Sequence, residues 1–252
     1  RMSFEHGRIY IDSGDDSWQM IEVDDGGWRV RNQDQPRFFR VRHHKPLCNP
    51  IPGGDPDALF EFVPVENEGE RILRLAWVIS AFHPGVPSPI LMFVGQQGSA
   101  KTTRCCRIRS LLDPSETAML GDVEFGNLAQ TFHHHAVPTF ENVASLNRRQ
   151  TDMFCRAVTG NGIEKRKLYT DLDQVLYSYR RGIMINAIDV PSTRPDFLDR
   201  CLVMHCRRIG AFLPTQQLDR QFEEARPQLL GALLDLLVKT MRALATIPPA
   251  RE

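Results

Sequence analysis

The amino-acid sequence predicts an α/β fold, with a small β-rich module before it and a helical subdomain after it. Three observations support this prediction. Short alternating segments joined by turn residues fill the first part of the chain, apolar strands then alternate with helical patterns, and a leucine-rich helical stripe ends the chain. The expected divisions are a β-rich module at 1–68, an α/β core at 69–212 and a helical lid at 213–252.

The composition is typical of a soluble globular protein and excludes several classes. The chain has 252 residues, of which 42% are hydrophobic and 25% charged, and its 31 Lys and Arg equal its 31 Asp and Glu. A globally basic surface is therefore absent, so any contact with nucleic acid has to be local. No apolar run is long enough for a bilayer and no signal peptide is visible. We expect a cytoplasmic protein with reduced cysteines, and a start on Arg1 is compatible with a fragment.

The N-terminal module is expected to consist of strands joined by tight turns. Residues 24–27, Asp-Asp-Gly-Gly, are a hairpin signal. The predicted strands are 8–12, 18–23, 28–31 and 38–42, and the Pro- and Gly-rich stretch 46–56 reads as a loop or linker. At the other end, helices are predicted at 222–225 and 227–244, with Pro227 in the first turn of the second.

A glycine-rich turn at 95–103 follows the apolar run 90–94 and precedes a predicted helix at 104–112. This order is the P-loop arrangement, in which backbone N–H groups bind phosphate oxygens. Lys101 would add charge for the β- and γ-phosphates, and the Thr102 hydroxyl suits Mg²⁺. Ala100 replaces the last glycine of the pattern G-x-x-x-x-G-K-[ST], and its Cβ restricts the backbone if φ has to be positive. We therefore predict that ATP is bound by Gly95, Gln97, Gly98, Ser99, Ala100, Lys101, Thr102 and Thr103.

A second predicted strand, 136–142, follows Lys101 by about forty residues and ends in an acidic side chain. In P-loop ATPases this position places a carboxylate beside the Mg²⁺–water shell, so Glu141 is the candidate. The next position commonly holds a water-activating Glu, but here it is Asn142, which cannot act as a base and could only orient water. The alternative is a solvated Glu at a strand end.

Two later segments contain further candidates. Asn186 interrupts the buried strand 182–188 and needs a polar partner, which is either a γ-phosphate with its water or a neighbouring loop. Lys165, Arg166 and Lys167 form the densest basic cluster, within two potential strands around a turn. They could contact a phosphate backbone, or they could be a solvated strand edge.

The run His133-His134-His135 is not predicted to bind a metal ion. Consecutive residues of a helix or strand point in different directions, so at most two of the three imidazoles could share one ion.

Together, the P-loop, the acidic strand end, the G-x-G with a basic hairpin, the strand with Asn186 and the Asp199-Arg200 pair resemble superfamily-three-type AAA+ helicases. The resemblance is closer to primase-helicase-like proteins of phages, plasmids and integrative elements. It covers about residues 77–245, and Ala100 and Asn142 depart from the family pattern.

The resemblance implies a ring, usually a hexamer, with ATP at subunit interfaces. Lys101, Thr102 and Thr103 would then bind nucleotide and Mg²⁺, with Glu141 at the metal-water shell and Asn186 as sensor. Arg200 would reach the neighbour's ATP, with Arg207 and Arg208 as rivals. Lys165 and Lys167 would grip single-stranded nucleic acid in the pore, and a primase or origin-binding partner is possible.

We therefore expect an ATP-driven motor acting on nucleic acid, most consistent with DNA and with replication of a mobile element. The alternative is a nucleotide-dependent assembly protein or switch with weak hydrolysis, which the departures at Ala100 and Asn142 favour. A third hypothesis is a small-molecule kinase. The lid-like C-terminus is compatible with it, but the Asp199-Arg200 pair does not suggest it.

Overall fold

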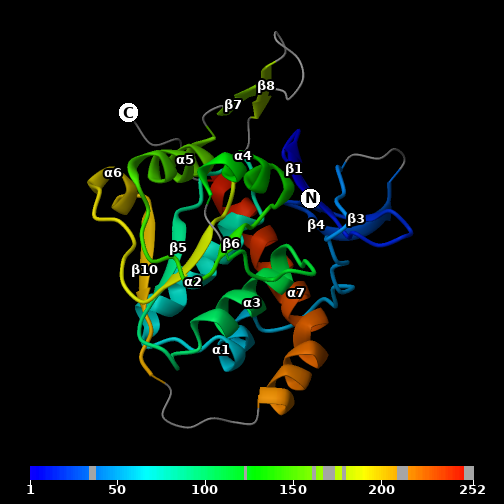
Figure 1. The fold of residues 1–252 in the computed structure, drawn as a ribbon. Helices are drawn as coiled ribbons and strands as arrows, with labels where there is room; N and C mark the ends of the chain where they lie inside the picture. The colour runs from blue at the N-terminus through cyan, green and yellow to red at the C-terminus, as the bar shows by residue number, and fades with distance from the viewer. Residues whose placement is uncertain are drawn as a thin grey trace.

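The computed structural model describes residues 1–33, 38–121, 124–160, 163–166, 174–177, 180–208 and 215–246, the two short ranges 163–166 and 174–177 by their backbone only. Figure 1 shows a central sheet with helices on both sides, and a second sheet near the N-terminus. No helix in these ranges is long and apolar enough to cross a membrane.

Four parallel strands form the central sheet, in the order β10-β5-β9-β6. They are β5 (Ile90–Val94), β6 (Thr139–Phe140), β9 (Met184–Ala187) and β10 (Cys201–His205). All residues of β5 and β9 are buried, as expected for central strands of a parallel sheet that is covered on both faces. Because the strands are parallel, their C-terminal ends all lie on one side of the sheet, and the loops that follow them lie on that side too.

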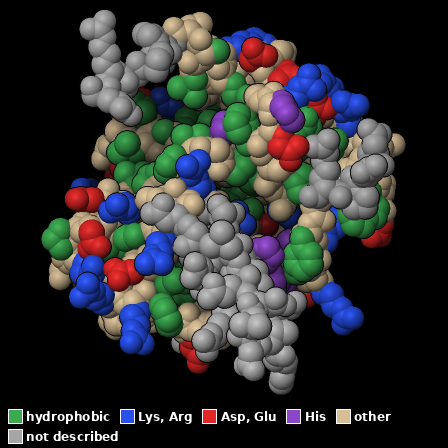
Figure 2. Space-filling view, turned by 90° about the horizontal axis from the view of Figure 1, so that it is seen from above, with side chains coloured by type: hydrophobic (Ala, Val, Ile, Leu, Met, Phe, Trp, Pro, Cys, Tyr) green, Lys and Arg blue, Asp and Glu red, His purple; other side chains and the backbone are tan. Residues whose placement is uncertain are grey.

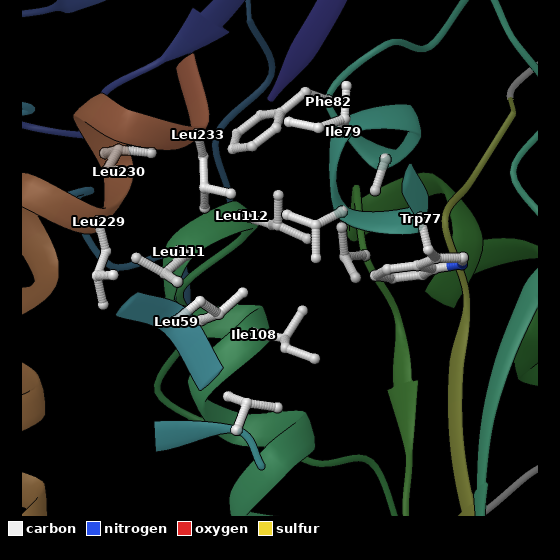
Figure 3. Close-up of a cluster of buried hydrophobic side chains, with 14 of the residues drawn as sticks. Leu59, Trp77, Ile79, Phe82, Ile108, Leu111, Leu112, Leu229, Leu230 and Leu233 are labelled. Atoms are coloured by element: carbon white, nitrogen blue, oxygen red, sulfur yellow. The ribbon is translucent and has the colours of Figure 1, made fainter. Parts of the chain in front are cut away.

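Alternate residues of the sheet belong to two separate hydrophobic cores. Leu91 and Phe93 pack with α2 (Glu68–Ala81), α3 (Lys101–Leu112) and α7 (Thr215–Thr246). Figure 3 shows Leu111 and Leu112 of α3 between leucines of α7 on one side and Trp77 of α2 on the other, with Phe82 beside Leu233. The opposite face packs with α4 (Phe125–His134), α5 (Arg148–Thr159) and α6 (Pro195–Leu198). The α/β layering predicted from the sequence is confirmed.

The N-terminal sheet is an antiparallel meander of β1 (Met2–Glu5), β2 (Arg8–Asp12), β3 (Gln19–Asp24) and β4 (Gly27–Asn32). At the predicted hairpin the Asp24 side chain accepts hydrogen bonds from the N–H groups of Gly26 and Gly27. One face of the sheet shares the core of α7, and Trp28 Nε1 donates to Asp235 of that helix at 2.7 Å. The divisions at residues 68 and 212 remain predictions.

The predicted strand at 38–42 does not form: the chain has a bend at Phe38 and then a turn that the His44 N–H closes on the Val41 carbonyl. Strand β1 was not predicted. A 3-10 turn, η1 (Pro56–Ala58), and the short helix α1 (Leu59–Phe62) lead from the N-terminal sheet to α2.

The C-terminal part is one helix rather than two, and Pro227 lies inside it. A proline in a helix interior leaves the carbonyl four residues earlier without its partner. Here that residue is Glu223, which is exposed, so water can satisfy its carbonyl. Buried leucines of α7 on the C-terminal side of Pro227 stabilise the continuous helix through packing.

Gly231 allows the backbone of residue 51 to lie against α7. Ile51 N–H donates to the Pro227 carbonyl at 2.9 Å, and a Cβ on Gly231 would lie 1.8 Å from the Ile51 carbonyl oxygen. The 46–56 stretch is therefore held against α7 through backbone contact.

We predict that Gly231→Ala destabilises the protein although it replaces a helical glycine. The backbone clash should lower the free energy of unfolding by about 2 kcal/mol, and scanning calorimetry should show a melting temperature lower by about 4–8 °C. Gly126→Ala in α4 is the matched control, because a Cβ there meets nothing within 4 Å. That variant should gain up to about 1 kcal/mol from helix propensity. Similar melting temperatures for both variants would contradict the role given to Gly231.

Candidate functional site

The loop from β5 to α3 adopts backbone conformations that glycine favours. Gly98 has φ +84°, and Gly95, at φ +157°, is so close to β10 that a Cβ would lie 2.4 Å from the Cys206 carbonyl oxygen. Ala100, which replaces the expected glycine, has φ +53° and ψ +29° and is the N-cap of α3. The sequence-based question about Ala100 is thus answered: its φ is positive, and the alanine is strained.

The first turn of α3 has backbone N–H groups without helical partners, and Ala100 offers no side chain to cap them. Such N–H groups and the helix dipole favour an anion. Lys101 stands at the start of this turn with its side chain folded back onto the loop. Its Nζ donates to the Gly95 carbonyl at 2.6 Å and to the Gln96 carbonyl at 3.0 Å. The ammonium group is thus held next to the same N–H groups, within the loop.

Three polar side chains meet at the edge where the central strands end. Thr102 Oγ1 donates to Glu141 Oε1 at 2.8 Å, and Asn186 Nδ2 donates to Thr102 Oγ1 at 3.1 Å. Glu141 directly follows β6, and Asn186 lies in β9, which pairs with both β5 and β6. The parallel pairing therefore brings together residues that are far apart in the sequence.

Asn186 is buried and uses both ends of its amide. Its Oδ1 accepts a hydrogen bond from the Asn142 backbone N–H at 2.7 Å, which fixes the orientation of the amide because an N–H can only donate. Asn142 has φ +52°, a conformation that Asn tolerates better than most residues. The neighbouring-loop contact, one of the two alternatives for Asn186, is thus present, and the other amide end points to Thr102.

A cavity of about 750 Å³ opens in front of the loop. Its lining includes polar side chains of Lys101, Thr102 and Glu141 and apolar side chains of Phe62 in α1 and Leu218 in α7. The volume is in the range of small-molecule sites. The eight residues predicted to contact nucleotide lie in this loop and in the first turn of α3, and all but Gly95 line the cavity, together with Glu141 and Asn142.

The apolar lining residues Phe62 and Leu218 were missed by sequence reasoning. Phe62 and Leu218 come from elements on either side of the α/β core in the sequence, and their own segments contain no motif. Arg107 joins them, since its guanidinium donates to the Phe62 carbonyl at 2.7 Å and pairs with Asp219 at 2.8 Å. The packing of α7 against α3 brings these lining residues together.

The three candidate arginines lie in different places. Arg200 precedes β10, so it is at the opposite edge of the sheet from the P-loop, where its guanidinium donates to the Asp196 carbonyl at 2.5 Å. Arg208 follows β10 and lies beside the loop of its own chain, within 4 Å of the position a Cβ on Gly98 would take. Arg207 pairs with Glu66 at 3.5 Å. Arg200 is therefore remote from the cavity of its own subunit.

The predicted basic hairpin is present as β7 (Ile163–Arg166) and β8 (Gln174–Tyr177), an isolated antiparallel pair. Figure 1 shows the pair projecting from the body of the protein. Lys165 is opposite Val175, Arg166 is opposite Gln174, and Lys167 and the predicted turn lie outside the described residues. On the face drawn in Figure 2, basic and acidic side chains of the described residues are interspersed.

We predict that Ala100→Gly stabilises the protein. Relief of the left-handed strain, about 1–2 kcal/mol, exceeds the entropy cost of a glycine, about 0.5–1 kcal/mol. The net gain of about 0.5–1 kcal/mol should raise the melting temperature by about 1–4 °C. Ala129→Gly in the middle of α4 is the control and should lower it. A loss of stability in Ala100→Gly would mean that the loop does not need a positive φ there.

Comparison with known proteins bears on the family and the fold. No curated protein matches the chain significantly. Two structures of the C-terminal region of NrS-1 match with TM-scores of 0.56 and 0.53 at 11% and 12% identity, over 89% and 96% of this chain and 70% and 73% of theirs. A JCV helicase structure has a TM-score of 0.42 at 14% identity, over 77% of this chain and 55% of its own. The NrS-1 likeness shows a shared α/β fold.

The family model named actinomycete integrative conjugative element replication protein matches residues 57–251. This range is well over half of the chain, and it includes the loop, the Thr102–Glu141–Asn186 contacts and the basic hairpin. The chain belongs to the family of actinomycete integrative conjugative element replication proteins.

Proposed function

We propose that this protein binds and hydrolyses ATP and uses it to act on nucleic acid, as a helicase-like ring ATPase of a mobile element. The observation that supports this most strongly is the 2.8 Å contact between Thr102 Oγ1 and Glu141 Oε1 at the end of the parallel sheet. A hydroxyl and a carboxylate can coordinate Mg²⁺, and the adjacent helix N-terminus can bind the phosphates of a nucleoside triphosphate. The family's role in replication agrees with an action on DNA.

The phosphates would lie on the N–H groups of the loop and of the first turn of α3. Lys101 would exchange its loop carbonyls for phosphate oxygens, which are charged and therefore better partners for an ammonium group. Thr102 and Glu141 would hold Mg²⁺, which would neutralise phosphate charge. The base would lie toward the apolar side chains of Phe62 and Leu218 in the lining of the cavity.

Hydrolysis requires a group that positions the attacking water. Glu141 would be occupied with the Mg²⁺ shell, and Asn142 has no basic group. The Asn186 amide and the Asn142 side chain would orient the water through hydrogen bonds without removing its proton. The strain at Ala100 and the absence of a carboxylate at position 142 favour slow turnover, so a nucleotide-dependent assembly switch is the second candidate function.

Nucleic acid would be held by the projecting hairpin. Lys165, Arg166 and Lys167 are a local positive charge on a neutral protein, as a contact to a single-stranded backbone requires. In a ring, the side of the sheet on which Arg200 lies, at the N-terminal end of β10, would face a neighbouring subunit. Arg200 would then act on the ATP of that neighbour. Its distance from its own subunit's cavity agrees with such a role. A primase or origin-binding protein is the expected partner.

We predict that single-stranded DNA stimulates ATP turnover and that Lys101→Ala abolishes it. Loss of a charge-assisted contact to phosphate, about 1.5–3 kcal/mol, should weaken nucleotide affinity by about 10- to 150-fold. Steady-state phosphate release and equilibrium binding of a fluorescent ATP analogue measure the two quantities. Lys239→Ala, an exposed lysine on α7, is the charge-matched control and should behave as the unmodified protein.

The outcomes of this experiment separate the candidates. DNA-stimulated turnover that Lys101→Ala removes supports the motor. Tight ATP binding without turnover supports the assembly switch. Unchanged nucleotide affinity in Lys101→Ala would rule out the P-loop as the nucleotide site.

We predict that the double variant Lys165→Ala, Lys167→Ala weakens binding to single-stranded DNA and lessens its salt dependence. Each phosphate contact contributes about 0.7 to the slope of log K against log salt, so two contacts should reduce it by about 1.4. Fluorescence anisotropy at several salt concentrations gives the slope. The variant Lys45→Ala, Lys239→Ala removes the same charge elsewhere and should keep the slope. Equal slopes for all three proteins would make the hairpin an ordinary solvated edge.

A further inference from the structure

Three histidines from distant parts of the chain meet behind the N-terminal sheet. His43 and His44 lie in the segment after that sheet, and His135 is the C-cap of α4. One ligand nitrogen of each lies within 4.8 Å of the others. The ring centres of His43 and His135 are 4.7 Å apart, and those of His43 and His44 are 5.2 Å apart.

Adjacent histidines converge here because they are in a turn and not in a regular strand or helix. The His44 N–H donates to the Val41 carbonyl at 3.0 Å, which closes the turn. The His43 carbonyl accepts from the Glu116 N–H at 2.9 Å and from Ser115 Oγ at 3.0 Å. The backbone of the pair is thus attached to the loop that follows α3, and both rings are held next to His135.

Two nitrogens of the cluster lack the partners that buried nitrogens normally have. His44 Nε2 donates to the His134 carbonyl at 2.8 Å, so its Nδ1 carries a lone pair. In the described part of the chain, His44 Nδ1 and His43 Nε2 are both buried without a hydrogen-bond partner. A carbonyl that orients one ring nitrogen while the other is left unpaired is the usual arrangement around a metal-binding histidine.

The third imidazole needs a small rearrangement. His135 Nδ1 accepts a hydrogen bond from the Arg109 guanidinium at 3.0 Å, so its proton is on Nε2. Binding through Nε2 would require Arg109 to leave Nδ1. The guanidinium retains three carbonyl acceptors, those of Asp113, Thr117 and Ala118. The buried Asp113 carboxylate lies 3.4 Å from Arg1 Nε and opposes the positive charges of both Arg1 and Arg109 beside the cluster.

We propose that His43, His44 and His135 together bind one divalent first-row transition metal ion, with Zn²⁺ the best match. Three neutral imidazoles without a carboxylate suit Zn²⁺ rather than Mg²⁺ or Ca²⁺. Tetrahedral Zn²⁺ places ligand nitrogens about 3.3 Å apart, so the present separations have to shorten through small side-chain rotations. The ion would tie the segment after the N-terminal sheet to the α/β core.

The site is independent of the proposed nucleotide site. It lies by Asp113, at the opposite end of α3 from Lys101, and the twelve residues of that helix span about 18 Å. Metal binding is therefore measured without nucleotide, and its failure says nothing about ATP.

The test uses the whole chain without a polyhistidine tag, stripped with a chelator and dialysed. Competition with a chromophoric Zn²⁺ indicator should show one Zn²⁺ per chain with micromolar or tighter affinity. Co²⁺ in place of Zn²⁺ should give the visible absorption of a low-coordinate complex with nitrogen ligands. Zn²⁺ at a hundredfold excess over its Kd should raise the melting temperature by several degrees.

Variants identify the ligands. His44→Ala and His135→Ala should each weaken Zn²⁺ binding at least tenfold. The control His133→Ala, two residues before His135 and outside the cluster, should change it less than twofold. His43→Ala, at a half-buried position, is the further variant if a buried change prevents folding. Absence of stoichiometric Zn²⁺ binding by the unmodified chain, or equal affinity in the cluster variants and His133→Ala, would overturn the proposal.

Discussion

The contact between Thr102 and Glu141 depends on the parallel order of β5, β9 and β6. The two residues are far apart in the sequence. They meet because α3, which begins with Lys101 and Thr102, follows β5, while Glu141 follows β6, and both strands end on the same side of the sheet. Asn186 in the strand between them donates to Thr102 and accepts from the Asn142 backbone, so it connects the two loops. The two hydrophobic cores keep β9 buried on both faces and thereby hold Asn186 in position.

Two residues at this edge have left-handed backbone conformations without being glycine. Ala100 begins α3, and Asn142 follows Glu141 directly. Such conformations persist only where the surrounding structure determines them, and they gather at functional sites. Ala100 is the N-cap of α3 and lines the cavity. At Asn142 the turn directs the backbone N–H to Asn186, and a side chain without a basic group faces the cavity.

The N-terminal sheet is attached to the rest of the protein at several points. Its apolar face shares a core with α7, Trp28 is hydrogen-bonded to Asp235, and the segment after it is attached to the loop behind α3. The histidine cluster lies at that last attachment. A metal ion there would strengthen the connection between the N-terminal sheet and the core at the end of α3 that is remote from the loop.

The sequence by itself determined the α/β class, the strand–loop–helix around Lys101 and the acidic strand end at Glu141, because these depend on local periodicity and on turn residues. It also predicted the hairpin strands around the basic cluster. It failed for residues 38–42, for the continuous helix through Pro227 and for the apolar cavity wall of Phe62 and Leu218. Tertiary structure decided these, since packing of α7 outweighs the local cost of a proline and brings together residues without a shared motif. The meeting of His43, His44 and His135 was likewise decided by tertiary structure, because sequence spacing contains no information about which turn packs against which helix end.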